Sequence, residues 1–252
     1  MPSLCGTGSG PRTRTSKNYE SAVIPSAGRN VVIPRRMKDP EYRQSQLDSV
    51  HDEHIAPVTE FISCLSTERP ELPGVPFVAP HYGPETARIL SLSSNPGPRA
   101  GGEKGSGLLS VQNDDASAER MLKVYAAAGI RDEDVVPWNA FPWFVHEQLP
   151  NGLTSDYIEQ GVHVLGRFLD LCPNIVSIVA HGGDAHRCAQ LLRSSRIVGP
   201  LVRRRGIHTW DARHTSNRAF ILSPQQRRDA EEDMVETYRQ AMTHAGLLPR
   251  EP

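Results

Sequence analysis

The pattern of apolar positions changes near residue 87 of the chain. Before that point, apolar side chains recur at helical spacing from residue 44 to 69, where Pro57 is expected to kink or divide the helix. After it come four short apolar runs, which we interpret as buried strands. These runs are residues 87–92, 134–139, 174–180 and 206–213.

The segments that separate and follow these runs have the spacing of amphipathic helices. They are residues 113–129, 155–173, 182–195 and 223–246. Asn113 or Asp114 is the expected cap of the first helix and Gly129 its end, while Ser223 and Pro224 are expected to begin the last. Four repeats of strand and helix predict an α/β fold with three layers (αβα), in which helices cover both faces of a four-stranded, mostly parallel central sheet.

The first 40 residues differ in composition from the rest of the chain. They are rich in Ser, Gly, Pro and Arg and show little apolar periodicity, so they bury too little surface to offset the entropy of ordering. We therefore expect residues 1–40 to be a disordered basic tail. The length of residues 41–252 suits a single domain with one core.

Charge is distributed unevenly along the chain. The formal net charge of the 252 residues is -1, which by itself argues against a polyanionic partner. Between Arg187 and Arg228, however, ten arginines stand against one acidic residue, Asp211. We expect this basic region to contact nucleic-acid phosphates, with binding that weakens as salt rises.

Cysteine usage and hydropathy bear on the compartment. The four cysteines form no CxxC pair, no N-terminal apolar segment resembles a signal peptide, and no run approaches the roughly 18 apolar residues of a membrane span. We therefore expect a cytoplasmic protein with reduced thiols and no membrane partner.

The histidines and glycine-rich segments do not match a cofactor site. The pair His181 and His186 lacks the helical i, i+4 spacing of two metal ligands, and no second cluster completes a tetrahedral site with Cys188. The segment GGEKG lacks the Ser or Thr, and the spacing, of a phosphate-binding GxxxxGK[ST] loop. We expect no metal and no other cofactor, and nucleotide hydrolysis is disfavoured.

Four polar clusters directly follow the four predicted strands. They are SSNPGP, WNAFPW, HGGDAH and RHTSNRAF. In a parallel α/β sheet, ligands bind outside the carboxyl ends of the strands, so these clusters are expected to converge on one crevice. The alternative for any single cluster is a loop that needs Gly, Asn or Pro for its backbone conformation.

Three residues of these clusters carry groups suited to catalysis or recognition. Asn95 is suited to orient a water or a substrate amide, because its side chain both donates and accepts; the alternative is an Asx-turn. Asn139, within an aromatic segment, is suited to read the edge of a planar base; the alternative is an amide that ties two loops together. His214 is suited to stabilise a developing anion, and a structural histidine is its alternative.

The motifs SNPGP, WNAFPW and RHTSNRAF resemble those of the uracil-DNA glycosylase superfamily, over about residues 76–220. The first motif is most similar to that of the mismatch-specific uracil/thymine branch. The resemblance implies that Asn95 positions the attacking water and that Asn139 reads the flipped base. It also implies that His214 stabilises charge on the departing base.

The resemblance extends to further binding residues, some of which depart from the family pattern. Leu109 stands where the best-known branch has an aromatic residue that stacks on the base, a contact worth roughly 1 to 3 kcal/mol. Gly97, beside Pro96, replaces a bulky tyrosine that excludes thymine, which favours a pocket open to larger bases. The shortened histidine motif places the remaining candidates for DNA contact at Arg213, Ser216 and Arg218.

The combined hypothesis is a monomeric DNA glycosylase. It hydrolyses the N-glycosidic bond of uracil or another deaminated base flipped out of damaged DNA, in base excision repair. The main alternative is a noncatalytic nucleic-acid-binding protein with the same fold. A hydrolase of free nucleosides is a third possibility, for which the arginine-rich region has no use.

Overall fold

The computed structural model describes residues 33–145, 148–149 and 152–249. Most of the expected tail, residues 1–32, lies outside the described residues. The last part of that expected tail is folded, because Arg36–Lys38 forms the short 3-10 helix η1. Met37 in η1 is buried, and its backbone N–H donates to the carbonyl of Gln112 at 3.0 Å. The folded part therefore begins before residue 41, since Met37 supplies an apolar anchor.

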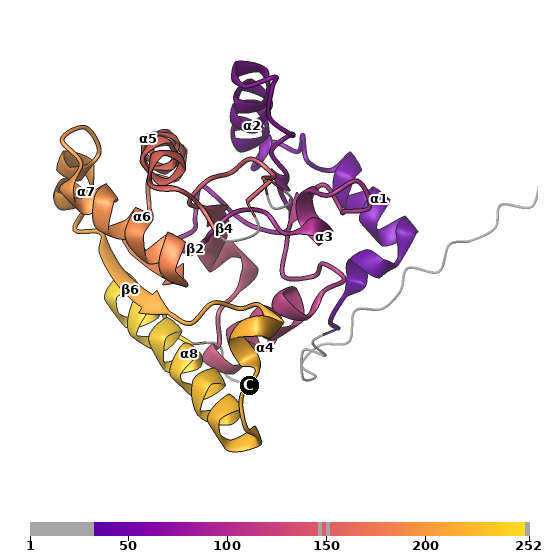
Figure 1. Cartoon of the computed structure of the whole chain (residues 1–252), viewed down its shortest axis with the longest axis vertical. Helices are drawn as coiled ribbons and strands as arrows, with labels where there is room; N and C mark the ends of the chain where they lie inside the picture. Colours follow the sequence, from indigo (N-terminus) through magenta and orange to yellow (C-terminus); the bar gives the residue numbers. More distant parts are fainter. Residues whose placement is uncertain (1–32, 146–147, 150–151, 250–252) are drawn as a thin grey trace, which may run out of the picture. The chain divides into compact units, whose positions relative to one another are not determined.

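A sheet of four parallel strands forms the centre of the fold, in the order β4-β2-β5-β6, and this confirms the predicted α/β class (Figure 1). The strands are β2 (Ile89–Ser93), β4 (Val135–Asn139), β5 (Ser177–His181) and β6 (His208–Ala212). β2 and β5 are buried along nearly their whole length because both of their faces are covered. β6 is an edge strand and is more exposed.

Helices cover both faces of this sheet and complete the three layers (Figure 1). On one face lie α4 (Ala116–Ala128) and α8 (Pro224–Ala245); on the other lie α2 (Ala56–Glu68), α5 (Ser155–Leu171) and α6 (Gly183–Ser194). The ring of Trp138 from β4 stacks on Phe168 of α5, with centroids 3.9 Å apart. Because successive side chains of a strand point to opposite faces of the sheet, the side chain of the next residue, Asn139, points to the other face.

The helix boundaries follow local signals in the chain. Pro57 divides the first helical region, as predicted, into α1 (Pro40–Asp48) and α2, and it occupies the first turn of α2. The predicted cap of α4 was wrong: Asp115, rather than Asn113 or Asp114, accepts the free backbone N–H groups of that first turn. Gly129 ends α4 in the left-handed conformation, as predicted.

The last helix, α8, begins at the predicted cap. The Ser223 hydroxyl accepts from the backbone N–H of Gln226, and the Gln226 side chain accepts from the backbone N–H of Ser223. Among the described residues, no helix is both long and apolar enough to cross a membrane.

Several short elements were not predicted from the sequence, because two to seven residues are too few to show a period. They are β1 (Phe77–Val78), α3 (Pro98–Gly101), β3 (Leu108–Leu109), η2 (Asp132–Asp134), α7 (Gly199–Arg205) and η3 (Asn217–Phe220). β1 and β3 pair in parallel as a separate two-stranded sheet. This small sheet holds Leu109 in place.

Candidate active site

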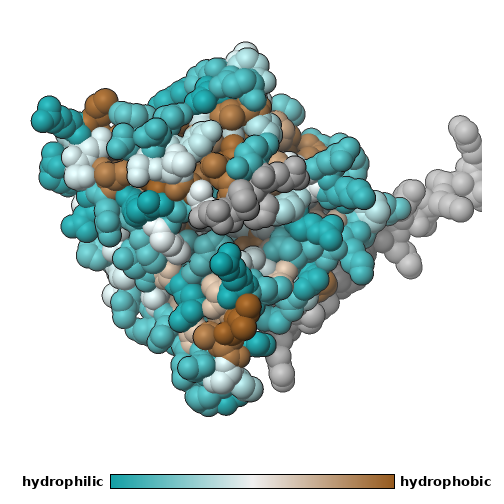
Figure 2. Space-filling model, in the orientation of Figure 1, coloured by the Kyte–Doolittle hydropathy of each residue, from teal (hydrophilic) through white to brown (hydrophobic). Residues whose placement is uncertain are grey.

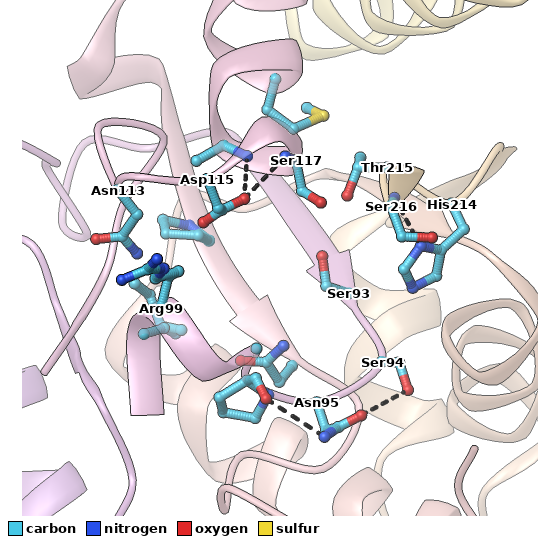
Figure 3. Close-up of a pocket in the computed structure, with 18 of the residues that line it drawn as sticks. Ser93, Ser94, Asn95, Arg99, Asn113, Asp115, Ser117, His214, Thr215 and Ser216 are labelled. Carbon is cyan, nitrogen blue, oxygen red and sulfur yellow. Dashed lines mark hydrogen bonds between the residues drawn. The ribbon is translucent and has the colours of Figure 1, made fainter. Parts of the chain in front are cut away.

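A cavity of about 850 Å³ opens at the carboxyl end of the central strands. The segments after β2, β4, β5 and β6 all contribute to its wall, together with β3 and the first turns of α4. In Figure 3, Ser94 and Asn95 lie on one side of the pocket, His214 and Ser216 on a second, and Asp115 on a third. Eight of the residues predicted from the sequence line this cavity: Asn95, Pro96, Gly97, Leu109, Asn139, His214, Ser216 and Arg218.

Asn139 is the last residue of β4, and it pairs in register with Ser93 of β2. The residue is only 3% exposed, and its Oδ1 is buried without a hydrogen-bond partner among the described residues. An unsatisfied buried acceptor costs about 1 to 3 kcal/mol, so such groups usually have a function. In the described part of the chain Oδ1 makes no bond to a second loop, and this oxygen is therefore available to a ligand.

Asn95 follows the end of β2, and neighbouring polar groups hold it loosely (Figure 3). Its Oδ1 lies 3.2 Å from the Ser94 hydroxyl, and its Nδ2 lies 3.4 Å from the carbonyl of Pro96. The same hydroxyl lies 2.7 Å from Oδ2 of Asp184, and it has one proton to donate. The shorter contact takes that proton, which leaves the Asn95 carbonyl oxygen free to accept from a water or a ligand.

His214 is held as a neutral imidazole that donates from Nε2. Its Nδ1 accepts from the backbone N–H of Ser216 at 3.0 Å, so the ring proton resides on Nε2 (Figure 3). Burial lowers the pKa of His214, and the nearby negative charge of Asp184 only partly opposes this effect. A neutral histidine in a cavity can donate a hydrogen bond to an anion without carrying a charge itself.

Gly182, directly after β5, allows His214 to come this close. Its φ of 83° is in the left-handed region, and a Cβ built on it would lie 2.8 Å from Cδ2 of His214. Glycine is therefore required here for both its backbone and its lack of a side chain.

Asp184, in the first turn of α6, is a site residue that the sequence reasoning missed. Its Oδ2 accepts from Ser94 at 2.7 Å and from the backbone N–H of Leu153 at 3.0 Å, while its Oδ1 accepts from Arg187 at 2.7 Å. Burial alone would raise the pKa of Asp184, but these three donors together lower it, so the carboxylate is ionised. Asp184 belongs to the cluster HGGDAH, which directly follows a predicted strand, and this position was the available signal. Only the three-dimensional contacts distinguish this acid from a surface residue.

The remaining wall of the cavity is largely apolar. Leu109, Val111, Met121 and Tyr125 line it from β3, the segment after β3 and α4. A Cβ built on Gly97 would meet no atom within 4 Å, so the entrance beside the loop after β2 is open. This combination suits a flat ligand with a polar edge.

The segment after β6 forms the rim of the cavity. Of the three residues predicted to contact DNA, Arg218 and Ser216 line the cavity, whereas Arg213 does not and instead donates to the carbonyl of Ala219 at 3.1 Å. Ile221, which was not predicted, is 81% exposed, and Figure 2 shows a hydrophobic group on the surface near this segment. An exposed aliphatic side chain beside a polar rim is a candidate contact for unstacked bases.

The arginine-rich region is divided between two edges of the sheet. Arg213 and Arg218 are exposed near the carboxyl edge and the cavity. α7 precedes β6 and lies at the amino edge, where its last residue, Arg205, donates to the carbonyl of Leu169 at 2.6 Å. The expectation that this region contacts nucleic-acid phosphates stays a prediction, and α7 lies away from the cavity because it precedes β6 and ends at Gly206.

The histidines once considered as metal ligands make other contacts. Nε2 of His186 lies 3.0 Å from the carbonyl of Ala180 and 2.9 Å from that of Ala212, and it ties β5 to β6. His181 contacts Tyr238 and the Arg213 carbonyl. Over the described ranges, no group of three or more His, Cys, Asp or Glu side chains is placed to hold a metal ion.

Comparison with known proteins gives no family for this chain. No protein-family model matches it, and no curated protein is similar to it. The functional argument therefore depends on the cavity and its side chains.

Proposed function

We propose that the protein is a DNA glycosylase related to the uracil-DNA glycosylase superfamily, which hydrolyses the N-glycosidic bond of a deaminated base in DNA. The observation that carries the proposal is the buried Oδ1 of Asn139, which has no hydrogen-bond partner among the described residues, in a cavity that Asn95 and a neutral His214 also line. These three groups match the three tasks of such an enzyme: reading the base, holding the water and stabilising the leaving group.

Base recognition falls to Asn139. Uracil, hypoxanthine and xanthine each have a carbonyl beside a ring N–H, and a side-chain amide offers the complementary donor and acceptor. A base that enters the cavity must first leave the duplex, which costs a few kcal/mol and less where the base is mispaired. The unsatisfied Oδ1 of Asn139 regains a partner when such a base binds, and this gain favours the bound state.

Bond cleavage uses groups on the other walls. The carbonyl of Asn95 holds a water that adds to the C1′ carbon of the sugar, and the bond from C1′ to the base nitrogen breaks. The electron pair of that bond leaves with the base, and the Nε2–H of His214 stabilises the resulting anion. The water supplies the hydroxyl on C1′, and its proton finally neutralises the base. The ionised Asp184 stabilises the positive charge that develops on the sugar.

The apolar wall supports a broad range of bases. Leu109 cannot stack as an aromatic ring does, and the open space beside Gly97 has no bulky group to exclude a larger base. We therefore include purine products of deamination, hypoxanthine and xanthine, beside uracil.

The three described cysteines are free, which supports a reducing compartment such as the cytoplasm.

Excision of bases from synthetic DNA tests the proposal directly. Oligonucleotides that carry uracil, hypoxanthine, xanthine or a G:T mismatch are incubated with the protein, and abasic sites are detected by alkaline cleavage. We expect cleavage at one or more lesions, and a fall of at least about 100-fold in single-turnover rate for Asn139→Ala and Asn95→Ala. An Asn139→Ala protein with the rate of the unmodified chain would disprove the assignment.

The second candidate function is noncatalytic binding of nucleic acid. Leu109 in place of an aromatic residue is the observation that favours it, since weaker base stacking suits a protein that no longer reacts. Salt-sensitive binding of damaged DNA without alkali-labile products identifies this alternative. Undamaged DNA that fails to compete with a nucleoside substrate identifies a nucleoside hydrolase instead.

A further inference from the structure

A chain of buried hydrogen bonds runs beneath the candidate active site, from the pocket floor to the backbone beside His214. The Ser91 hydroxyl lies 2.8 Å from the Tyr238 hydroxyl, which lies 2.8 Å from Nε2 of His181. Nδ1 of His181 lies 3.2 Å from the carbonyl of Arg213. Ser91, Tyr238 and His181 are all buried, and they come from β2, α8 and β5.

The direction of this chain follows from the chemistry of its members. A carbonyl oxygen accepts only, so Nδ1 of His181 must donate to Arg213. In a neutral imidazole the other nitrogen then accepts, so the Tyr238 hydroxyl donates to Nε2 and in turn accepts from Ser91. Burial lowers the pKa of His181 to about 4, so the ring is neutral at physiological pH. The protons of Tyr238 and His181 thus each have one position, and the Tyr125 hydroxyl joins the chain at its pocket end, where it bonds with Ser91 and Tyr238.

Both ends of the chain touch the candidate site. Ser91, at one end, lines the floor of the cavity together with Tyr125. The other end fixes the carbonyl of Arg213, the residue before His214. Gly182, the residue after His181, packs directly against the imidazole of His214. Two consecutive residues therefore constrain His214: His181 by its hydrogen bond to the preceding carbonyl, that of Arg213, and Gly182 by direct contact with the ring.

We propose that Tyr238 and His181 are positioning residues for His214, which keep its Nε2–H directed at a ligand in the cavity. The catalytic consequence rests on the proposed glycosylase function, whereas the effect on the His214 ring does not. The rest of the loop has its own support, because Arg120 donates to the carbonyl of Thr215 and packs on the Phe220 ring at 3.8 Å. Loss of the chain is therefore expected to shift His214 without unfolding the segment.

The test uses Tyr238→Phe, which removes one oxygen and keeps the ring, with a matched control. In the control, Ser177→Ala removes the bond of 2.9 Å from the Ser177 hydroxyl to the carbonyl of Ala241, also between α8 and the sheet. That bond is equally buried but leads nowhere near the cavity. We expect similar losses in Tm for both variants. Only Tyr238→Phe is expected to lower the single-turnover excision rate, by about 10-fold or more, with Kd for DNA within about twofold.

A second measurement, NMR titration of His214, is independent of activity. The titratable groups that interact with its ring are Asp184 of α6 and His181 of β5. In the unmodified chain, we expect His214 to titrate below its ordinary value and to carry its proton on Nε2. In Tyr238→Phe the loosened ring is more hydrated, so its pKa is expected to rise towards about 6.5. Ser177→Ala is expected to leave it unchanged.

A conservative replacement sharpens the test at His181. The amide of His181→Asn retains a donor near the position of Nδ1. This variant is therefore expected to keep the pKa of His214 close to that of the unmodified chain and to keep part of the excision rate. His181→Leu lacks the donor and is expected to behave like Tyr238→Phe or worse. Equal loss of rate in the asparagine and leucine variants would argue that packing alone matters and would overturn the positioning role.

The outcomes separate this inference from the proposed function. If the unmodified protein excises no base, the glycosylase proposal fails, and the titration of His214 still tests the positioning role. If excision occurs but Tyr238→Phe retains both the rate and the His214 titration, the positioning role is wrong and the function stands. An equal effect of Ser177→Ala on rate would reduce Tyr238 to a general structural contact and would also overturn the inference.

Discussion

At the scale of single residues, the site depends on side chains held in one protonation state and one orientation. The backbone N–H of Ser216 selects the tautomer of His214, and three donors keep Asp184 ionised. Asn139 differs, because its Oδ1 is left without a partner among the described residues. The proposed function assigns charge stabilisation to the fixed groups and recognition of the ligand to the unpaired oxygen of Asn139.

Gly182→Ala tests the close approach to His214. The new Cβ would lie 2.8 Å from the imidazole, so we expect His214 to be displaced and kcat/KM for base excision to fall about 100-fold. Gly206→Ala is the matched control, because Gly206 has a similar left-handed backbone, with φ of 64°, but no atom within 4 Å of its Cβ position. Comparable losses of activity in both variants would show that backbone strain, rather than contact with His214, is responsible.

At the scale of elements, the edge of the sheet at which a basic segment lies decides its role. The segment after β6 places Arg218 on the rim of the cavity, whereas α7 carries Arg203 and Arg204 at the opposite edge. Their proximity along the chain does not bring them to one surface. In Figure 2, the surface around the position of α7 mixes hydrophilic residues with scattered hydrophobic ones.

Salt dependence of DNA binding distinguishes these two groups of arginines. Loss of one phosphate contact reduces the slope of log K against log salt by about 1. We expect Arg218→Ala to show this reduction and the double variant Arg203→Ala with Arg204→Ala to show none, in titrations of one fluorescent oligonucleotide at several salt concentrations. The reverse pattern would place the DNA on the amino edge of the sheet and would contradict the proposed function.

At the scale of the whole molecule, burial of neutral histidine links stability to pH. His181 titrates at about 4 in the folded chain and at about 6.5 when unfolded, so the unfolded state binds more protons between these values. The stability that neutral burial provides is present above about pH 6.5 and is lost as the pH falls towards 4. At about 1.4 kcal/mol per pH unit, this amounts to about 3 kcal/mol.

Urea denaturation at pH 7 and pH 5 checks this linkage. We expect the free energy of unfolding to fall at pH 5, and His181→Asn to show a smaller fall because it has no proton to gain there. His81, which is also buried with a pKa of about 4, contributes a similar dependence that remains in the variant. An identical fall in both proteins would show that His181 is not protonated on unfolding in this range.

Much of the fold could be predicted from the sequence, and the reasons are local. Each central strand is an apolar run next to a helix with a cap or a stop, as at Gly129 and Ser223. The positions of Asn95, Asn139 and His214 follow from the rule that parallel strands end at one edge, and all three line one cavity.

The remainder depends on contacts between distant parts of the chain. Asp184 is distinguished only by donors from Ser94 and Leu153, and the chain of Tyr238 and His181 joins three elements. No spacing within one segment reveals such contacts. The division of the arginines was missed for the same reason, because it depends on the direction of α7 rather than on its composition.

The separate two-stranded sheet that carries Leu109 has a consequence for how this site can change. β1 and β3 pair only with each other, while Asn95, Asn139 and His214 lie at or just after the ends of the central strands. In the proposed function, substitution of the wall residues Leu109 and Val111 therefore changes the shape that is offered to the base, while these three residues keep their support from the central sheet. Under the proposed function, this wall is the place where a lineage, or an engineer, can select a new base while the chemistry is retained.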